Sequence, residues 1–319
     1  MNELEKLRND SLVREKVLSD GISSFNFSSK AFFDKAWHDE TIRARGLFVD
    51  TESGRVVARS YNKFFNLGEM PETQIDSLKE NLVFPLVPYL KENGFLGLIF
   101  SRDGQTLRYA SKSTNEGTFA GYLRDIAEKT ISNATRNKIA WYLFCMDRTL
   151  VVEVIDPIND PHIVDYDNQH LVALDLVDNE FDFKPIDYHV LYQKANSWGM
   201  EHKTKYCPLN NFFSFESVIN QIESNPTTHR YEGFVFTDQN GFMFKYKTPW
   251  YRGWKMARGI MQQLFAGKEM SDIKRIDEKL ADIERMTGED IIESLPQFVE
   301  VHKNDEKKPS IIDFYHSLG

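Results

Sequence analysis

Three pairs of apolar segments joined by short, glycine-containing turns constrain the fold of this chain most. Residues 232–236 and 242–247 flank an Asn-Gly turn, and residues 95–100 and 106–110 flank an Asp-Gly turn. Residues 46–50 and 56–61 flank Thr51-Glu52-Ser53-Gly54, where the glycine can adopt positive φ. Each pair predicts a β-hairpin. The sequence therefore predicts antiparallel sheet as the main architecture.

Other segments predict helices and single strands around these hairpins. Strands are expected at 22–27 and 171–177, and a strand broken at Asp147-Arg148 is expected over 142–154. Helices are expected over the polar lead at 1–20, over 114–136, and from the Ser271-Asp272 cap to Thr287-Gly288. We predict an α+β fold with two domains, a β-rich body over 1–250 and a small helical appendage over 251–319.

Charge and cysteine content narrow the class of protein. A net charge of −9 argues against bulk coating of nucleic acid, although a basic groove can exist on an acidic body. Cys145 and Cys207 form no metal or disulfide pattern, which favours a reducing compartment. The charged N-terminus and the lack of an apolar run near about 18 residues predict a cytoplasmic, nuclear or viral protein, neither secreted nor bound to a membrane.

Lys91 is the candidate nucleophile. It follows an apolar run and precedes Asn93-Gly94, which puts its amine at a strand–turn junction beside backbone that can approach a ligand closely. We expect Lys91 to open the first strand of the hairpin at 95–110. Taken alone, the tetrapeptide also fits an ordinary surface lysine before a turn.

Lys245 and Lys247 are two apart on a predicted strand, so they share a face and a bound phosphate can neutralise their mutual repulsion. The alternative is a solvated polar face opposite Phe242, Phe244 and Tyr246.

An unperturbed lysine has a pKa of about 10.4 and is not a nucleophile at neutral pH. Burial, the two lysines and a bound Mg²⁺ would favour the neutral amine of Lys91, whose attack on phosphorus gives a phosphoramidate. The carboxylates Glu92, Glu153 and Glu232 would hold the hydrated metal.

The order of these motifs resembles that of the covalent nucleotidyltransferases. Lys-x-Asn-Gly at 91–94 is followed by Glu153, by Glu-Gly-Phe-Val at 232–235 and by Lys-x-Lys at 245–247. Upstream lie Ala-Arg-Gly-Leu-Phe at 44–48 and Lys-Phe-Phe-Asn at 63–66. The whole set is similar to the ATP-dependent RNA ligases of the phage RNA ligase 1 and fungal tRNA ligase type. The Lys-Phe-Phe-Asn block separates these from DNA ligases and capping enzymes.

The resemblance implies an antiparallel-sheet nucleotidyltransferase fold of the ATP-grasp-like ligase type and an RNA-joining reaction in three steps. Lys91 would take AMP from ATP, AMP would pass to an RNA 5′-phosphate, and a 3′-hydroxyl would displace it. The cofactors would be ATP and Mg²⁺, with Mn²⁺ as an alternative ion. The residues implied at the ATP site are Arg45, Lys63, Phe65, Leu90, Glu92, Asn93, Gly94, Lys112, Glu153, Glu232, Lys245 and Lys247, with Glu92, Glu153 and Glu232 reaching the metal through water.

The expected partner is RNA with 5′-phosphate and 3′-hydroxyl ends. No G-x-x-x-x-G-K-[ST] motif is present, so a separate kinase or phosphatase would heal damaged ends. The candidate RNA-contacting residues are Tyr251, Arg252, Trp254, Lys255 and Arg258. Asn93 stands where most of the superfamily has aspartate, as in fungal tRNA ligases, so Glu92 would have to serve the metal. Oligomeric state, the RNA that is sealed and any 2′-phosphate requirement stay open.

Ordinary structural interpretations exist for several of these residues. Arg45 could pair with Asp39 or Glu40, Lys63 could be a strand-edge charge, and Lys112 a solvated turn lysine. Phe64 and Phe65 could be plain core residues, and the helix start at 250–258 could pack its tryptophans inward. The alternative functions are a capping guanylyltransferase or DNA ligase, and a catalytically idle RNA-binding scaffold with a relic pocket.

Overall fold

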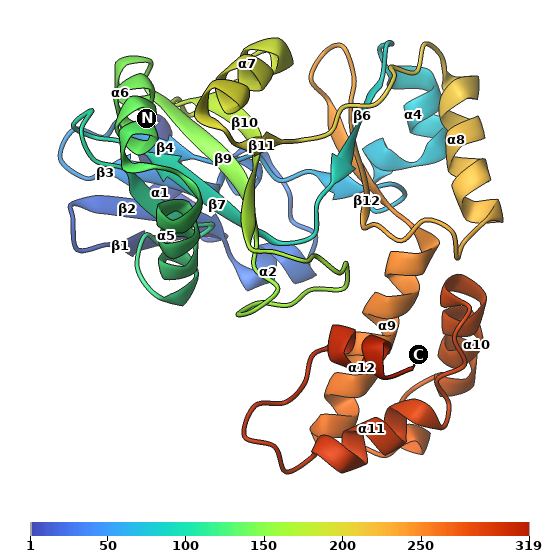
Figure 1. Cartoon of the computed structure of the whole chain (residues 1–319). Helices are drawn as coiled ribbons and strands as arrows, with labels where there is room; N and C mark the ends of the chain where they lie inside the picture. Colours follow the sequence, from blue (N-terminus) through green and yellow to red (C-terminus); the bar gives the residue numbers. More distant parts are fainter. Residues whose placement is uncertain (1, 319) are drawn as a thin grey trace. The chain divides into compact units, whose positions relative to one another are not determined.

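The computed structural model describes residues 2–318, which form two compact units (Figure 1). The first unit consists of the chain up to Phe64, Gly94–Asn159 and Asn168–Lys203. The second consists of Phe65–Asn93, Asp160–Asp167 and the chain from Thr204 onward. The Lys-x-Asn-Gly motif therefore lies where the chain leaves the second unit and enters the first.

The first unit contains two sheets. One is antiparallel with the order β1-β2-β3-β4, and the other has the order β11-β10-β9-β7-β8. Phe48 of the first sheet stacks on Phe100 of the second, with 6.5 Å between ring centroids, so the two sheets share apolar packing. The strands are β1 (Val13–Val17), β2 (Ile22–Phe27), β3 (Arg45–Asp50), β4 (Val56–Arg59), β7 (Phe95–Phe100), β8 (Arg108–Ser111), β9 (Arg148–Ile155), β10 (His170–Asp178) and β11 (Glu201–His202).

Helices cover both sheets of the first unit. Leu123 and Leu143, on two successive helices, belong to one buried cluster with Val152 and Leu176 of the five-stranded sheet. Leu7 of the first helix lies in a second cluster, with residues of the four-stranded sheet. The helices are α1 (Glu3–Asn9), α2 (Ser29–Phe33), α3 (Asp39–Arg43), α5 (Thr118–Thr130), α6 (Asn133–Cys145) and α7 (Tyr188–Trp198).

The second unit is built on a sheet with the order β5-β13-β12-β6. Its strands are β5 (Phe65–Asn66), β6 (Val87–Lys91), β12 (Gly233–Thr237) and β13 (Met243–Lys247). β12 pairs antiparallel with both β6 and β13, and β5 pairs parallel with β13. Side chains alternate on β13, so Phe244 and Tyr246 are buried while Lys245 and Lys247 face the other way. The buried face packs on α4 (Ile75–Asn81) and α8 (Phe212–Ser224).

The predicted helical tail is confirmed. From Pro249 the described chain forms α9 (Pro249–Phe265), α10 (Ile276–Thr287), α11 (Ser294–His302) and α12 (Ile311–Ser317). A short 3₁₀ turn at Met270–Asp272 lies between α9 and α10, and another at Pro71–Thr73 precedes α4. Thr248 caps α9 by accepting the N–H of Tyr251, and Pro249 occupies the first turn. Trp250, Trp254 and Phe314 are in the core of this helical cluster. The domain boundary at residue 250 stays a prediction, and the two compact units group the chain differently.

The α+β class and all three hairpins are confirmed, as β3–β4, β7–β8 and β12–β13. The bounds of four predicted elements were wrong. The lead over 1–20 is helical only at α1, because β1 pairs along β2. The helix over 114–136 is two helices, because Ser132 caps α6 by accepting the N–H of Thr135.

Since α6 runs on to Cys145, the strand expected from 142 begins only at Arg148. The helix expected from Ser271 begins at Ile276, after the 3₁₀ turn.

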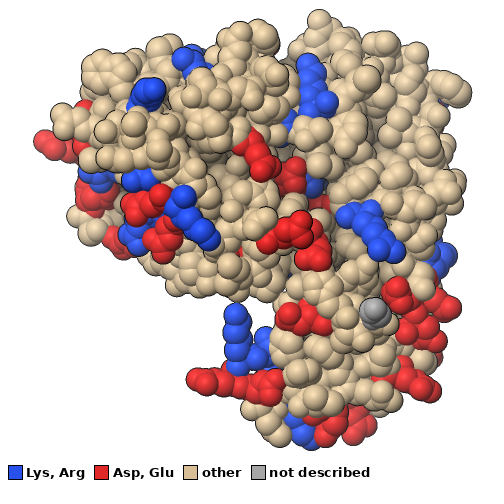
Figure 2. Space-filling model, viewed as in Figure 1, with Lys and Arg blue, Asp and Glu red and all other residues tan. Residues whose placement is uncertain are grey.

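Charged side chains are interspersed on the face shown in Figure 2. None of the helices in the described part of the chain combines the length and apolar character needed to cross a membrane.

Candidate active site

Lys91 lies at the end of β6, not at the start of β7 as expected. It is opposite Gly233 of β12, and Gly233 is in turn opposite Lys247 of β13. The sheet of the second unit therefore brings Lys91, Lys247 and Glu232, the residue before Gly233, to one end of three neighbouring strands. The local sequence pattern predicted that Lys91 adjoins a strand. It could not predict that β6 pairs with β12, because that pairing joins segments far apart in the sequence.

Glu232 joins the two lysines. Its side chain is buried, and its two carboxylate oxygens lie 3.0 Å from Lys91 Nζ and 2.8 Å from Lys247 Nζ. Burial raises the pKa of the Glu232 carboxyl, but the charges of Lys91 and Lys247 outweigh burial and hold the pKa below its ordinary value. Glu232 is therefore ionised and shared between two cations.

Lys247 is also packed on an aromatic ring. Its Nζ lies 4.6 Å from the centroid of Tyr251, a cation–π contact. Burial lowers the pKa of Lys247, and the carboxylate of Glu232 only partly offsets this. Burial also raises the pKa of Tyr251 to about 12, so its hydroxyl stays protonated. Tyr251 thus belongs to the same buried group as Glu232 and Lys247.

Lys245 and Lys247 line one pocket of about 500 Å³ in the second unit. Arg252 and Lys255 add two more cations, and Asn66 of the Lys-Phe-Phe-Asn block lies beside Lys245 through the β5–β13 pairing. The acidic residue in this lining is Glu223, whose carboxylate accepts hydrogen bonds from Tyr246 Oη and Arg252 Nη2 at 2.8 and 2.7 Å. The pocket is therefore basic on a protein whose net charge is negative, and its chemistry suits an anion.

Glu92 and Asn93 follow Lys91 and contact the Asp160–Asp167 segment. The Tyr166 hydroxyl donates to Glu92 at 2.9 Å, and its oxygen accepts a hydrogen bond from the backbone N–H of Asn93 at 3.0 Å. Asn93 is buried, and its side-chain amide donates to Glu232 at 2.8 Å. Sequence reasoning assigned this segment only as a loop and missed Tyr166. The signal available was an aromatic residue in a stretch rich in aspartate.

Five predicted site residues belong to the first unit: Arg45, Lys63, Gly94, Lys112 and Glu153. Burial lowers the pKa of Arg45, and the charge of Glu153 partly offsets it. Burial lowers the pKa of Lys112 too, and Arg45 lowers it further. Arg45 therefore interacts electrostatically with both Glu153 and Lys112. Lys112 is exposed, and its Nζ lies 5.4 Å from the centroid of the Phe27 ring.

Arg45 donates to Ser60 Oγ at 3.2 Å and to the carbonyl of Tyr61 at 3.4 Å. Lys63 donates to the carbonyl of Phe64 and lies over the ring of Trp37, 5.0 Å from its centroid. Phe65 is buried on β5 and Leu90 is on β6.

Gly94 is required by packing. A Cβ on this residue would lie 2.1 Å from the carbonyl oxygen of Val154, which no side chain tolerates. Its N–H donates to Glu153 at 3.0 Å, so the glycine lets the chain run close against β9. A role of this backbone in approaching ATP stays a prediction.

The tryptophans of the tail pack inward, as the ordinary interpretation held. Trp254 is 2% exposed and meets Phe314 and Tyr315 edge-on, which leaves it no surface for stacking on RNA. Of the candidate RNA-contacting residues, Lys255 is exposed, and Arg252 and Arg258 are partly exposed.

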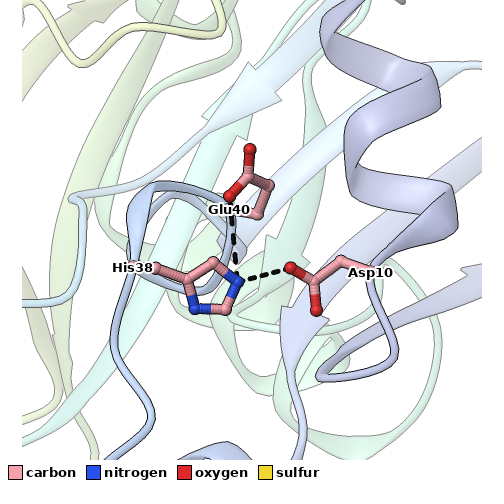
Figure 3. Close-up of side chains that lie close together, drawn as sticks. All are labelled: Asp10, His38 and Glu40. Atoms are coloured by element: carbon pink, nitrogen blue, oxygen red, sulfur yellow. Dashed lines mark hydrogen bonds and ion pairs between the residues drawn. The ribbon is translucent and has the colours of Figure 1, made fainter.

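One group of three potential metal ligands occurs among the described residues, and sequence reasoning did not single it out. Asp10, His38 and Glu40 place ligand atoms within 4.8 Å of one another. Figure 3 shows the His38 ring between the two carboxylates, with Nε2 2.5 Å from Asp10 and 3.8 Å from Glu40. The close Asp10 contact makes this an ion pair between the residue that follows α1 and the residue that precedes α3. The assignment of Glu92, Glu153 and Glu232 to a metal stays a prediction.

Comparison with known proteins decides the family. The family described as RNA ligase matches residues 43–251, which is more than half of the chain. The chain belongs to the RNA ligase family. The matched region contains Arg45, Lys91, Glu232 and Lys247, and ends at Tyr251.

Curated relatives of this RNA ligase family member are longer proteins. "tRNA ligase 1" of Schizosaccharomyces pombe is 26% identical over 281 residues, covering 77% of this chain and 35% of that protein. "RNA ligase 1" of bacteriophage TS2126 is 25% identical over 242 residues, covering 72% of this chain and 56% of that protein. The chain thus spans about a third to a half of the length of these relatives.

Solved structures support the fold. A structure titled "Archaeal ATP-dependent RNA ligase" superposes with a TM-score of 0.60 at 13% identity, covering 98% of this chain and 84% of that one. A putative ATP-dependent DNA ligase from Aquifex aeolicus also has a TM-score of 0.60 at 13% identity. The predicted ligase-type nucleotidyltransferase fold is confirmed.

Proposed function

We propose that this chain is an ATP-dependent RNA ligase that joins an RNA 5′-phosphate to a 3′-hydroxyl through lysyl-AMP on Lys91. The observation that carries the proposal is the shared Glu232 carboxylate, which holds the Nζ atoms of Lys91 and Lys247 at one end of the β6–β12–β13 sheet. A basic pocket adjoins it, lined by Lys245 and Lys247. Membership of the RNA ligase family makes nucleotidyl transfer the chemistry that fits these residues.

Lys91 must lose a proton before it can act. Its ion pair with Glu232 stabilises the ammonium form, so the pair has to loosen when ATP binds. The ammonium proton passes to water, and the neutral amine attacks the α-phosphorus. The N–P bond forms, the nitrogen gives its second proton to water, and the bond from that phosphorus to the β-phosphate oxygen breaks as pyrophosphate leaves. Lys245 and Lys247 would hold the α-phosphate by charge and hydrogen bonding. AMP passes next to the RNA 5′-phosphate, and a 3′-hydroxyl displaces it.

The cofactors of the proposal are ATP and a divalent cation, with Mg²⁺ preferred. Carboxylate oxygens are the donors that Mg²⁺ takes, and both oxygens of Glu232 already hold cationic groups in this structure. Glu92, Glu153 and Glu232 would hold the ion, mainly through its waters. When bound, the ion would neutralise charge on the transferred phosphate.

The remaining roles follow from similarity to the family. Arg45 would act on the departing pyrophosphate, and Lys63 and Lys112 would contribute to the ATP site. Arg252, Lys255 and Arg258 would contact RNA phosphates. We also infer an adenylyltransferase domain over 1–250, a helical domain over 251–319, a separate end-healing enzyme and a cytoplasmic setting.

The test is incubation with α-labelled ATP and Mg²⁺, followed by sealing of RNA strands with 5′-phosphate and 3′-hydroxyl ends. We expect a covalent AMP adduct on Lys91 that pyrophosphate removes, and a sealed RNA product. Lys91→Ala should abolish the adduct, and Lys79→Ala, on the exposed face of α4, should retain it. An adduct formed only with GTP, sealing confined to DNA, or wild-type protein that behaves as Lys91→Ala would overturn the proposal.

A further inference from the structure

Asn93, two residues after Lys91, uses its whole side-chain amide in hydrogen bonds within the protein. It is 3% exposed. Its amide nitrogen donates to Glu232 at 2.8 Å and to the hydroxyl of Tyr251 at 3.3 Å. Its amide oxygen accepts the backbone N–H groups of Ile163 and Val164 at 3.1 and 3.0 Å. Both ends of the amide are therefore used inside the protein.

The partners fix which end of the amide faces which way. Backbone N–H groups can only donate, so the atom facing Ile163 and Val164 must be the acceptor oxygen. The ionised Glu232 carboxylate can only accept, so the atom facing it must be the donor nitrogen. An aspartate at position 93 would satisfy the two N–H groups but would set a second carboxylate oxygen about 2.8 Å from Glu232. An ionised carboxylate at this position cannot donate to Glu232, so the hydrogen bond would be lost.

The Asp160–Asp167 segment is fastened at the same place. Ile163 is buried in the cluster of the C-terminal helices, with Trp254 and Phe314. Asp165 contacts His316 of α12, with 2.8 Å between Oδ2 and Nε2. Asn93 thus connects Glu232 on one side with a segment held by the helical tail on the other.

We infer that Asn93 is a positioning residue: its amide holds Glu232 between Lys91 and Lys247 and locks the Asp160–Asp167 segment against the nucleophile. This inference rests on the proposed function, because the reaction that Asn93 supports is adenylation of Lys91. The donor hydrogen bond of Asn93 to Glu232 is what an ionised carboxylate cannot supply.

The test is the single-turnover rate of Lys91 adenylation by ATP and Mg²⁺ in Asn93→Asp. We expect the rate to fall at least about tenfold while the KM for ATP changes less than about threefold, because Glu232 loses a donor that aligns it. The matched control is Asn211→Asp, the same substitution in the same unit, where aspartate can still cap α8. The control should adenylate as wild type does.

A double variant separates positioning from general damage. In Asn93→Asp with Glu232→Gln, the glutamine amide can donate to the new carboxylate and restore the bond in reverse. We expect the loss of Tm in the double variant to be smaller than the sum of the two single losses. If Asn93→Asp does not fold, the double variant should.

Three results would overturn the inference: Asn93→Asp at or above the wild-type rate, losses of Tm that simply add, or a double variant as unfolded as the single one. If wild-type protein forms no adduct, the proposed function fails instead. The two failures are therefore distinguishable.

Discussion

Glu232→Gln removes one negative charge from a buried site that holds two lysines. The glutamine oxygen can accept from one lysine, but its NH₂ group then faces a second donor, either Lys91 Nζ, Lys247 Nζ or the amide of Asn93. The substitution keeps the volume of the side chain, so its cost comes from charge and hydrogen bonding rather than from a cavity. The loss of stability in Glu232→Gln therefore reports on charge and hydrogen bonding rather than on packing.

The expected magnitude follows from burial. Breaking a fully buried ion pair by removing one partner costs about 3–5 kcal/mol, because the other charge is left uncompensated. The side chains of Lys91 and Lys247 are 22% and 19% exposed, so water recovers part of this. We expect a loss of about 2–3 kcal/mol in the free energy of unfolding of the second unit.

Hydrogen exchange read by mass spectrometry, across a denaturant series, measures this loss locally. Peptides covering β6 and β12 should lose protection, and peptides covering β9 of the first unit should change far less. The control is Glu180→Gln, which removes the partner of Lys184 in a pair whose side chains are 53% and 56% exposed. That substitution should cost less than about 0.5 kcal/mol. Equal losses in the two variants would refute the reasoning about Glu232.

Three further predictions concern other parts of the chain. Gly233→Ala should prevent stable β12–β13 pairing, because its Cβ would lie 1.9 Å from the carbonyl oxygen of Tyr246, whereas Gly241→Ala has open space and should cost only about 1–2 kcal/mol in thermal unfolding. Burial raises the pKa of Asp156, but hydrogen bonds from Asn159 and Gln169 outweigh it and lower the pKa below its ordinary value. Asp156 therefore stabilises the fold at pH values above its unfolded pKa of about 4, and this stabilisation is lost as the pH falls through the folded pKa. Asp156→Asn should lower the free energy of unfolding by about 1–3 kcal/mol at pH 7. A difference in the free energy of unfolding between wild type and variant that does not narrow below about pH 4 would contradict this. Lys255→Ala should weaken RNA binding and reduce the slope of log K against log salt by about 0.7, and an unchanged slope, or the same change in Lys268→Ala, would count against a phosphate contact.

Local sequence patterns were enough to predict much of the secondary structure. Asn240-Gly241 and Asp103-Gly104 supply the backbone conformations of tight turns, so the hairpins around them could be predicted without knowing any distant contact. Alternation on 242–247 likewise separated the buried aromatic residues from Lys245 and Lys247. The lead at 1–20 failed because the edge position beside β2, not local propensity, makes Val13–Val17 a strand.

The sequence by itself supplied the candidate site residues: a lysine before Asn-Gly, a glutamate before Gly-Phe-Val and two alternating lysines, in an order that resembles an RNA ligase. Only the tertiary structure decided that Lys91 closes β6, that Glu232 joins it to Lys247, and that Asn93 faces Glu232 with its nitrogen. Strand pairing and buried hydrogen bonds unite residues about 140 positions apart, since Asn93 and Glu232 differ by 139. No local pattern contains that information, because any strand of suitable alternation could have paired with β12.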